Sequence, residues 1–195
     1  RSSDLVVSMM AMALMLCMSF TACDVETDEK PGGTNIQDMC GNWDVAWYAV
    51  DASGNILDEE PWTEGTIFTF NKADNGTTQM WISDQDTYWA FQFLVNIDYA
   101  AKTFSAPATY YGPDMEEIAA LIASGVTTDS KGNPLVAGQA TVTNGKIMLG
   151  AGKNIHGVAC DSISFDISFT DDNYPAKYGF DHYRVEGKKY SGFTE

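Results

Sequence analysis

Positive charge is scarce in this sequence. Among its 195 residues, 11 Lys and Arg stand against 27 Asp and Glu, which gives a formal net charge of −16 at pH 7. Affinity for nucleic acid rests on basic side chains that neutralise phosphates, so this balance argues against nucleic acid as a partner. Aromatic residues make up 12% of the chain and supply the apolar surface that a disordered acidic tail lacks. The composition indicates a folded acidic globule of one domain.

The motifs of the common catalytic frameworks are also missing. The chain contains no GxSxG, HExxH, GxxxxGK[ST] or CxxC sequence. Its two histidines are His156 and His182. A hydrolase could use His182 as a base together with Asp181 or an unidentified serine. Spacing alone does not identify such a group, so we assign no catalytic residue.

No known metal-binding pattern is present. Asp84 with Asp86, or Asp171 with Asp172, could hold a hard cation through carboxylate oxygens. No EF-hand loop surrounds either pair. The sequence therefore predicts neither a metal site nor another cofactor.

The longest hydrophobic run lies near the N-terminal end. Residues 5–22 carry no charge and are followed at once by Cys23 and an acidic stretch, as in a secretory signal peptide. The residues Phe20-Thr21-Ala22-Cys23 resemble the lipobox of bacterial lipoproteins, in which a cysteine after a small residue is acylated before cleavage. A plain signal peptide cut near Ala22 and a retained transmembrane anchor are the alternatives.

This interpretation divides the chain into a signal peptide (1–22), a lipidated, flexible acidic tether (23–38) and a single β-barrel domain (39–195). Acyl chains on Cys23 would hold the protein at a membrane. We therefore expect a cell-envelope protein anchored to the outer membrane, facing either the periplasm or the cell exterior.

Two of the four cysteines remain in the folded domain, Cys40 and Cys160. In an oxidising compartment such a pair can form a disulfide. Two buried free thiols explain the sequence nearly as well, so both possibilities stay open.

Past residue 40 the pattern favours β-structure. In residues 87–98, and again in 160–171, apolar side chains alternate along the chain with a period of two. Shorter strands are expected at 43–50, 66–71, 77–83, 103–110, 139–143, 146–150, 178–185 and 189–193. Asn144-Gly145 is typical of a tight hairpin turn. About eight to ten short strands in succession predict an all-β protein, built as an antiparallel barrel or sandwich.

One short helix is expected between the strands. Asp114 and Glu117 have the spacing of a capping box after Pro113, and an apolar stripe follows and ends at Gly125. We expect a helix over 114–124 that either packs on the barrel wall or covers the barrel mouth as a lid.

The surplus of large aromatic side chains suggests a binding function. A closed barrel of this size could keep a cavity for one small lipid or other apolar or amphipathic ligand. The candidate ligand-binding residues are Trp47, Trp89, Phe91, Phe93 and Phe165, and core packing is the alternative role for each. Surface glycan binding through exposed rings, an assembly role at the cell surface and a hydrolase activity are the other functions left open.

A family resemblance agrees with a barrel. Gly41-Asn42-Trp43 resembles the Gly-x-Trp opening of lipocalin-like barrels, whose tryptophan closes the barrel floor. With the lipobox, the strand at 161–165, the Asp171-Asp172 turn and residues 185–193, the chain resembles the lipid-binding putative hydrolase family of bacterial lipoproteins. That family's last strand tends to read Gly-x-Arg-x-Thr-Gly-Phe, and Lys189 stands here at the Arg position. The resemblance implies a lipocalin-like, calycin-type barrel over about residues 40–195, with lipid binding.

Overall fold

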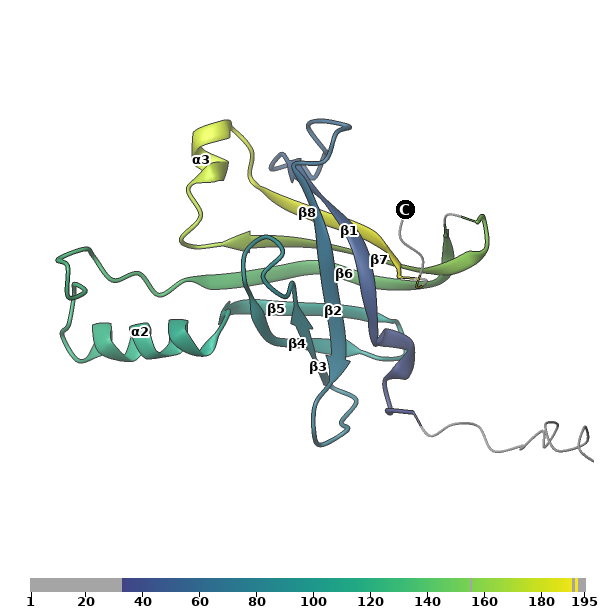
Figure 1. Cartoon of the computed structure of the whole chain (residues 1–195), viewed down its shortest axis with the longest axis horizontal. Coiled ribbons are helices and arrows are strands. Elements are labelled where there is room, and N and C mark those ends of the chain that lie inside the picture. The colour runs from purple at the N-terminus through teal and green to yellow at the C-terminus, as the bar shows by residue number, and fades with distance from the viewer. Residues whose placement is uncertain (1–32, 155, 191, 193–195) are drawn as a thin grey trace, which may run out of the picture. The chain divides into compact units, whose positions relative to one another are not determined.

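The computed structural model of the chain describes residues 33–154, 156–190 and 192. The predicted signal peptide, Cys23 and most of the tether lie outside the described residues. Eight strands form a closed barrel in which each strand pairs antiparallel with the next and the last pairs with the first (Figure 1). The expected all-β antiparallel barrel is thus confirmed.

The elements follow one another around the barrel in chain order. The strands are β1 (Gly41–Val50), β2 (Thr63–Asn71), β3 (Gln79–Ser83), β4 (Gln92–Asp98), β5 (Thr103–Tyr110), β6 (Gln139–Lys153), β7 (Ala159–Phe169) and β8 (His182–Lys189). The helices are the 3-10 turn η2 (Gln37–Met39), α2 (Pro113–Ala123) and α3 (Tyr174–Tyr178). No helix in the described part of the chain combines the length and hydrophobicity needed to span a membrane.

Alternation along the strands places every second side chain in the barrel interior. On β1, Trp43, Val45 and Trp47 are buried while the residues between them are partly exposed. β7 repeats the pattern with Ile163 and Phe165, among others. The apolar faces predicted from the period of two are therefore the walls of one continuous core.

The expected hairpin turn at Asn144-Gly145 is wrong. β6 runs without interruption through these residues, because β5 pairs with it on one side as far as Lys146 and β7 pairs with it on the other side as far as Lys153. Asn144 takes a positive φ of 55° and marks a shift in register with β7. The Asn-Gly pair forms a β-bulge within a long strand.

Two other predicted boundaries are corrected. The strand expected at 87–98 begins only at Gln92, since Ala90 has a φ of 58° that interrupts the extended chain. The strand expected at 178–185 is replaced at its start by α3, which has Pro175 in its first turn and ends at Gly179 in the left-handed conformation.

The helix α2 begins one residue earlier than expected, at Pro113, with Gly112 as its N-cap. Asp114 therefore lies in the first turn and makes no capping hydrogen bond, so the predicted capping box is wrong. No residue of α2 is buried, and the helix extends away from the strands beyond the end of β5 (Figure 1). Met115 alone packs against the core.

The two ends of the barrel differ in their covering. The loops 51–62, 84–91, 111–138 and 170–181 all join strands at the same end, which we call the aromatic end. At the opposite end, the floor, Trp43 is fully buried and its indole N–H donates to Thr69 Oγ1 at 2.9 Å. Thr69 in turn donates to the carbonyl of Met39 in η2. The 3-10 turn is thereby fixed across the floor.

Candidate functional site

The aromatic end contains a continuous set of rings that runs from the core to the surface. Trp47 is fully buried, and its ring centre lies 4.8 Å from that of Tyr88 and 5.9 Å from that of Tyr183. Tyr183 contacts Phe180 at 5.0 Å, and Trp62 lies 5.4 Å from Phe180. Because Trp62 is 36% exposed, the set reaches solvent at this end of the barrel.

The five predicted ligand-binding residues all belong to the core or pack against it. Trp47, Phe91, Phe93 and Phe165 are buried, and Trp89 is half-buried. Trp89 stacks on Phe169 with ring centres 4.6 Å apart. Phe165, by contrast, packs against Phe104, which lies at the floor end of β5. The structure thus brings Trp47, Trp89, Phe91 and Phe93 to one region, and their role in ligand binding stays a prediction.

One carboxylate holds the loop that carries Tyr88 and Trp89. Asp84 is completely buried, and its two oxygens accept hydrogen bonds from the backbone N–H groups of residues 86 and 88–91 at 2.6–3.3 Å. A carboxylate bound by several N–H donors fixes a loop strongly. The loop includes three non-glycine residues with positive φ, Gln85, Asp86 and Ala90, so Asp84 offsets an otherwise unfavourable backbone.

This loop also completes the barrel wall. β3 pairs only with the second half of β2, from Phe68 onward. Beside the first half, Thr87 takes the place of a strand: its hydroxyl accepts from Thr66 N–H at 3.2 Å and lies 3.3 Å from Thr66 O. The wall here is closed by one loop residue rather than by a ladder of strand hydrogen bonds.

The indole N–H of Trp47 lies near this loop and has no hydrogen-bond partner among the described residues. A Cβ atom at Gly65 would be 3.8 Å from that nitrogen and 2.8 Å from Thr87 Oγ1. A buried donor without a partner is energetically unfavourable. The site is therefore suited to a ligand that brings an acceptor to Trp47.

Two adjacent carboxylates bind the phenols at the aromatic end. Tyr111 donates to Asp171 at 2.6 Å, and Tyr183 donates to Asp172 at 2.7 Å. Burial and then the neighbouring carboxylate raise the pKa of Tyr111 to about 12. Burial, followed by the hydrogen bonds of Tyr88 and Asp172, also raises the pKa of Tyr183 well above its ordinary value. These phenols stay protonated at neutral pH.

The helix α2 lies beside this site without covering it. Tyr111 lies two residues before the start of α2. The Gly138 N–H donates to the sulfur of Met115 at 3.3 Å, which fixes the base of the helix near the barrel. Leu121 and Ile122, toward the other end, are exposed. Of the two expected arrangements, the structure shows neither a stripe packed on the wall nor a lid over the mouth.

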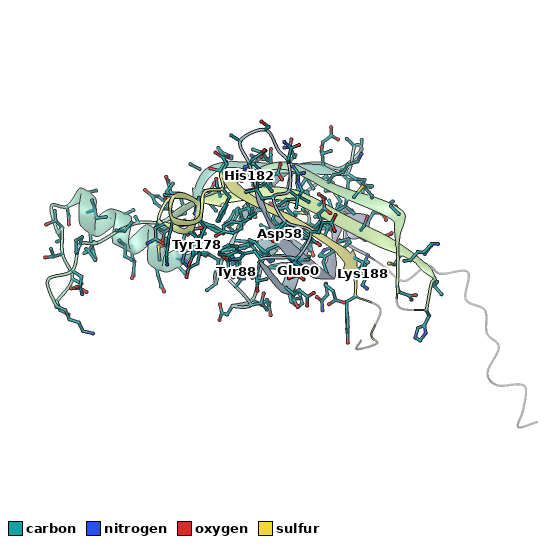
Figure 2. The ribbon with its side chains drawn as sticks, turned by 90° about the horizontal axis from the view of Figure 1, so that it is seen from above. Asp58, Glu60, Tyr88, Tyr178, His182 and Lys188 are labelled. Carbon is teal, nitrogen blue, oxygen red and sulfur yellow. The ribbon has the colours of Figure 1, made fainter. Side chains whose placement is uncertain are left out.

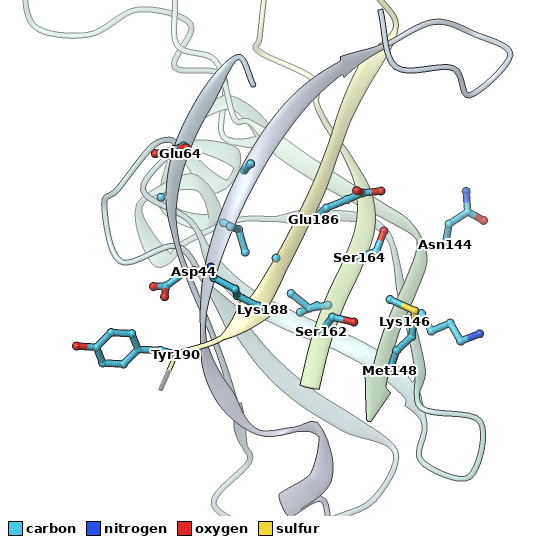
Figure 3. A pocket seen from close by; sticks show the side chains of 15 residues that line it. Asp44, Glu64, Asn144, Lys146, Met148, Ser162, Ser164, Glu186, Lys188 and Tyr190 are labelled. Carbon is cyan, nitrogen blue, oxygen red and sulfur yellow. The ribbon is translucent and has the colours of Figure 1, made fainter. Parts of the chain in front are cut away.

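A groove of about 970 Å³ lies on the outer face of the barrel, across β2, β1, β8, β7 and β6 (Figure 3). Small side chains, including Ala46, Ser162 and Ser164, line it together with Lys146 and Glu186. The polar side chains alternate with the buried residues of the same strands, so they point away from the core. The groove lies outside the set of rings but approaches it at Gly65, where an added Cβ would be 3.8 Å from the Trp47 indole nitrogen.

The proposed hydrolytic histidine lies between two carboxylates. His182 Nδ1 is 2.8 Å from Asp181 Oδ2, and its Nε2 is 3.7 Å from Asp166 Oδ1. Burial alone would raise the pKa of Asp166, but hydrogen bonds from Arg184 and Asn144 hold it below its ordinary value. The histidine therefore has an orienting carboxylate, while its other nitrogen faces a second carboxylate rather than a serine hydroxyl.

The other candidate groups are placed as follows. The sequence allowed either a disulfide between Cys40 and Cys160 or two free thiols. In the structure both are free thiols. Burial raises the pKa of the Cys40 thiol. Within the described residues, no group of three or more His, Cys, Asp or Glu side chains could hold a metal ion. Asp84, considered above as a cation ligand, has its oxygens occupied by backbone N–H groups.

Sequence reasoning missed the polar members of the site. Tyr88, Tyr111 and Tyr183 come from three different segments, and no spacing in the sequence connects them. The Asp171-Asp172 turn is part of the family resemblance, but its phenol partners follow only from barrel closure. For Trp62 the sequence does carry a signal: the acidic residues just before it are typical of a solvent-exposed turn, which would place this tryptophan at the surface.

Comparison with known proteins gives one result. A model of the family described as "lipid-binding putative hydrolase" matches residues 28–194. No curated protein matches the chain. The matched range includes all eight strands and the loops that join them at the aromatic end and at the floor.

Proposed function

Since the chain belongs to the lipid-binding putative hydrolase family, we propose that it binds the acyl chain of a lipid, or a similar apolar group, at the aromatic end of its barrel. The observation that carries this proposal is the uninterrupted set of rings from buried Trp47 to exposed Trp62. Apolar burial against such rings supplies the free energy of binding.

Uptake requires the rings to separate, because they pack in contact with one another. Tyr88 and Trp89 are the rings that would have to turn aside, while Asp84 holds the backbone of their loop in place. The exposed Leu121 and Ile122 lie on the part of α2 that extends away from the strands, so gating by this helix would require it to swing toward the end of the barrel.

The experiment compares ligand uptake with folding. Replacing both Trp89 and Phe91 with Ala is expected to abolish uptake of a fluorescent fatty acyl probe by the domain from residue 33 onward, while its far-UV circular dichroism stays that of a barrel. Phe104→Ala, at a buried ring near the floor end of β5, is the matched control: it lowers stability but leaves ligand uptake by the folded fraction unchanged. Equal loss of folding and uptake in the double variant would show that these rings only pack the core.

The proposal includes a membrane anchor on Cys23, with the barrel held in the cell envelope at the outer membrane. It is supported by the uncharged run at 5–22 and the lipobox-like residues before Cys23. Metabolic labelling with a fatty acid should label the full-length protein and not Cys23→Ser. Unchanged labelling of that variant would refute the anchor, and protease treatment of intact cells decides between the two faces of the membrane.

A second candidate function is glycan binding in the outer groove. Its lining offers donors and acceptors of both charge signs, such as Lys146, Asn144 and Glu186, with the exposed Tyr190 at its edge (Figure 3). A neutral polyhydroxylated chain matches such a lining better than an acyl chain does. Binding to a glycan array that is lost in Tyr190→Ala and kept in Trp89→Ala would establish it. Failure to bind any glycan would refute it.

A further inference from the structure

Carboxylates are concentrated at the aromatic end of the barrel. The loops 51–62 and 170–181, which carry the exposed rings at this end, hold seven Asp and Glu against one Lys. At the floor, the loops 72–78 and 99–102 carry one Asp and two Lys. A surplus of one sign around an opening produces a potential that repels ligands of the same sign. This end of the barrel is therefore unfavourable for a fatty carboxylate or a phosphate.

Exposed rings lie within this acidic surface. Trp62, Tyr174 and Tyr178 contact one another with ring centres 5.2–6.0 Å apart, and each is at least 36% exposed. Figure 2 looks onto the side of the molecule where α3 and the 51–62 loop lie, with Tyr178 and the carboxylates Asp58 and Glu60 labelled. Aromatic faces surrounded by carboxylates attract organic cations.

The protein already places one cation on these rings. Lys177 Nζ lies 4.8 Å from the centre of the Tyr178 ring. This contact shows that the ring face is accessible to an ammonium group. From Trp62 the rings continue through Tyr183 to the buried Trp47, so a headgroup on the exposed rings would lie at the outer end of an apolar path.

Building on the proposed lipid binding, we propose that the ligand is an amphiphile with an ammonium headgroup. The headgroup lies against Trp62 and Tyr178, on the side of the loop that carries Glu59 and Glu60 just before Trp62, and the apolar chain passes along the rings toward Trp47. Cation–π attraction and the acidic surface select the headgroup, while burial of the chain supplies most of the affinity. The site discriminates against amphiphiles whose headgroup is anionic.

The test uses probes that share one saturated chain and differ in the headgroup: an alkyl trimethylammonium salt, the fatty acid and an alkyl maltoside. Binding to the domain is followed by tryptophan fluorescence and native mass spectrometry, below the concentration at which each probe forms micelles and at a pH where the acid is ionised. We expect the ammonium probe to bind at least about ten-fold more tightly than the acid at low salt, with the ratio falling as salt is added.

Two variants with matched controls locate the headgroup. Lys177→Ala removes the resident cation, so it should tighten binding of the ammonium probe about two- to five-fold, whereas Lys131→Ala on the loop after α2 should change it less. Glu59→Gln with Glu60→Gln should weaken it about three-fold at low salt. The same charge change on the outer wall, Glu64→Gln with Glu186→Gln, should leave it within error.

The outcomes separate this inference from the proposed function. If the acid or the maltoside binds as tightly as the ammonium probe, the headgroup assignment is overturned while lipid binding stands. If the two paired glutamate variants weaken binding equally, the attraction is a general one for cations and the site assignment is overturned. If none of the probes binds, lipid binding itself fails.

Discussion

Lys189 Nζ lies 5.5 Å from the centre of the Trp43 ring and 3.3 Å from Asp161 Oδ2. The last strand thus places a cation over the tryptophan that closes the barrel floor, and Asp161 of β7 holds that cation in position. Lys189 stands where the family tends to have arginine. The lysine side chain, although shorter than arginine, still reaches the face of the Trp43 ring. The departure from the family pattern leaves this end of the barrel closed.

The floor contact gives the first prediction. Lys189→Met keeps the length of the side chain but removes its charge, so it should lower the free energy of unfolding by about 1 kcal/mol, the combined size of a cation–π contact and a half-buried ion pair. Lys189→Arg should retain or raise stability. Urea unfolding measures both, and the exposed Lys146→Met is the control. A Lys189→Met variant as stable as the wild type would show that the floor does not depend on this cation.

The second prediction concerns the loop held by Asp84. Asp84→Asn replaces one acceptor oxygen with an N–H₂ group that faces backbone donors, so the free energy of unfolding should fall by about 2–4 kcal/mol. Amide hydrogen exchange should accelerate most in residues 84–91. Asp86→Asn, its exposed neighbour, changes the same charge with little expected effect. Similar exchange rates in both variants would contradict the role given to Asp84.

Tyrosine ionisation gives the third prediction. In the folded protein the pKa of Tyr111 is raised to about 12, whereas an unfolded tyrosine has a pKa of about 10. The folded state therefore keeps a proton that the unfolded state releases. This contribution to stability is complete below about pH 10 and is lost as the pH rises from about 10 to 12. Unfolding in urea measured across this range should show a decline that is smaller in Tyr111→Phe. An equal decline in the variant would refute the assignment.

A fourth prediction follows from close packing of strands β1 and β8. A Cβ atom at Gly187 would lie 2.9 Å from the Cα of Val45 and closer still to the carbonyl oxygen of Asp44. Gly187→Ala should force these strands apart and lower the free energy of unfolding by about 1–3 kcal/mol. Gly112→Ala, where nothing lies within 4 Å of the added atom, should be nearly neutral. Thermal unfolding compares the two variants directly, and equal melting temperatures would contradict the argument.

The errors made from the sequence have a common cause. Asn144-Gly145 has the local chemistry of a hairpin turn, yet both neighbours of β6 continue past it, so the pair forms a bulge. The alternating residues around Trp89 predicted an extended strand, but Asp84 bends that backbone into a loop. In both cases a contact with a distant or differently oriented segment outweighed the local preference.

The sequence by itself determined the all-β class, the faces of most strands, the acidic character of the chain and the residues that resemble the family, because these depend on periodicity and composition. Closure of the barrel decided which distant residues and loops lie together. It brought Tyr111 to Asp171 and Tyr183 to Asp172 and Tyr88, and it gathered four acidic loops at one end. Such contacts join residues whose separation in the chain carries no pattern, so only the pairing of β8 with β1 and the resulting loop positions could reveal the site.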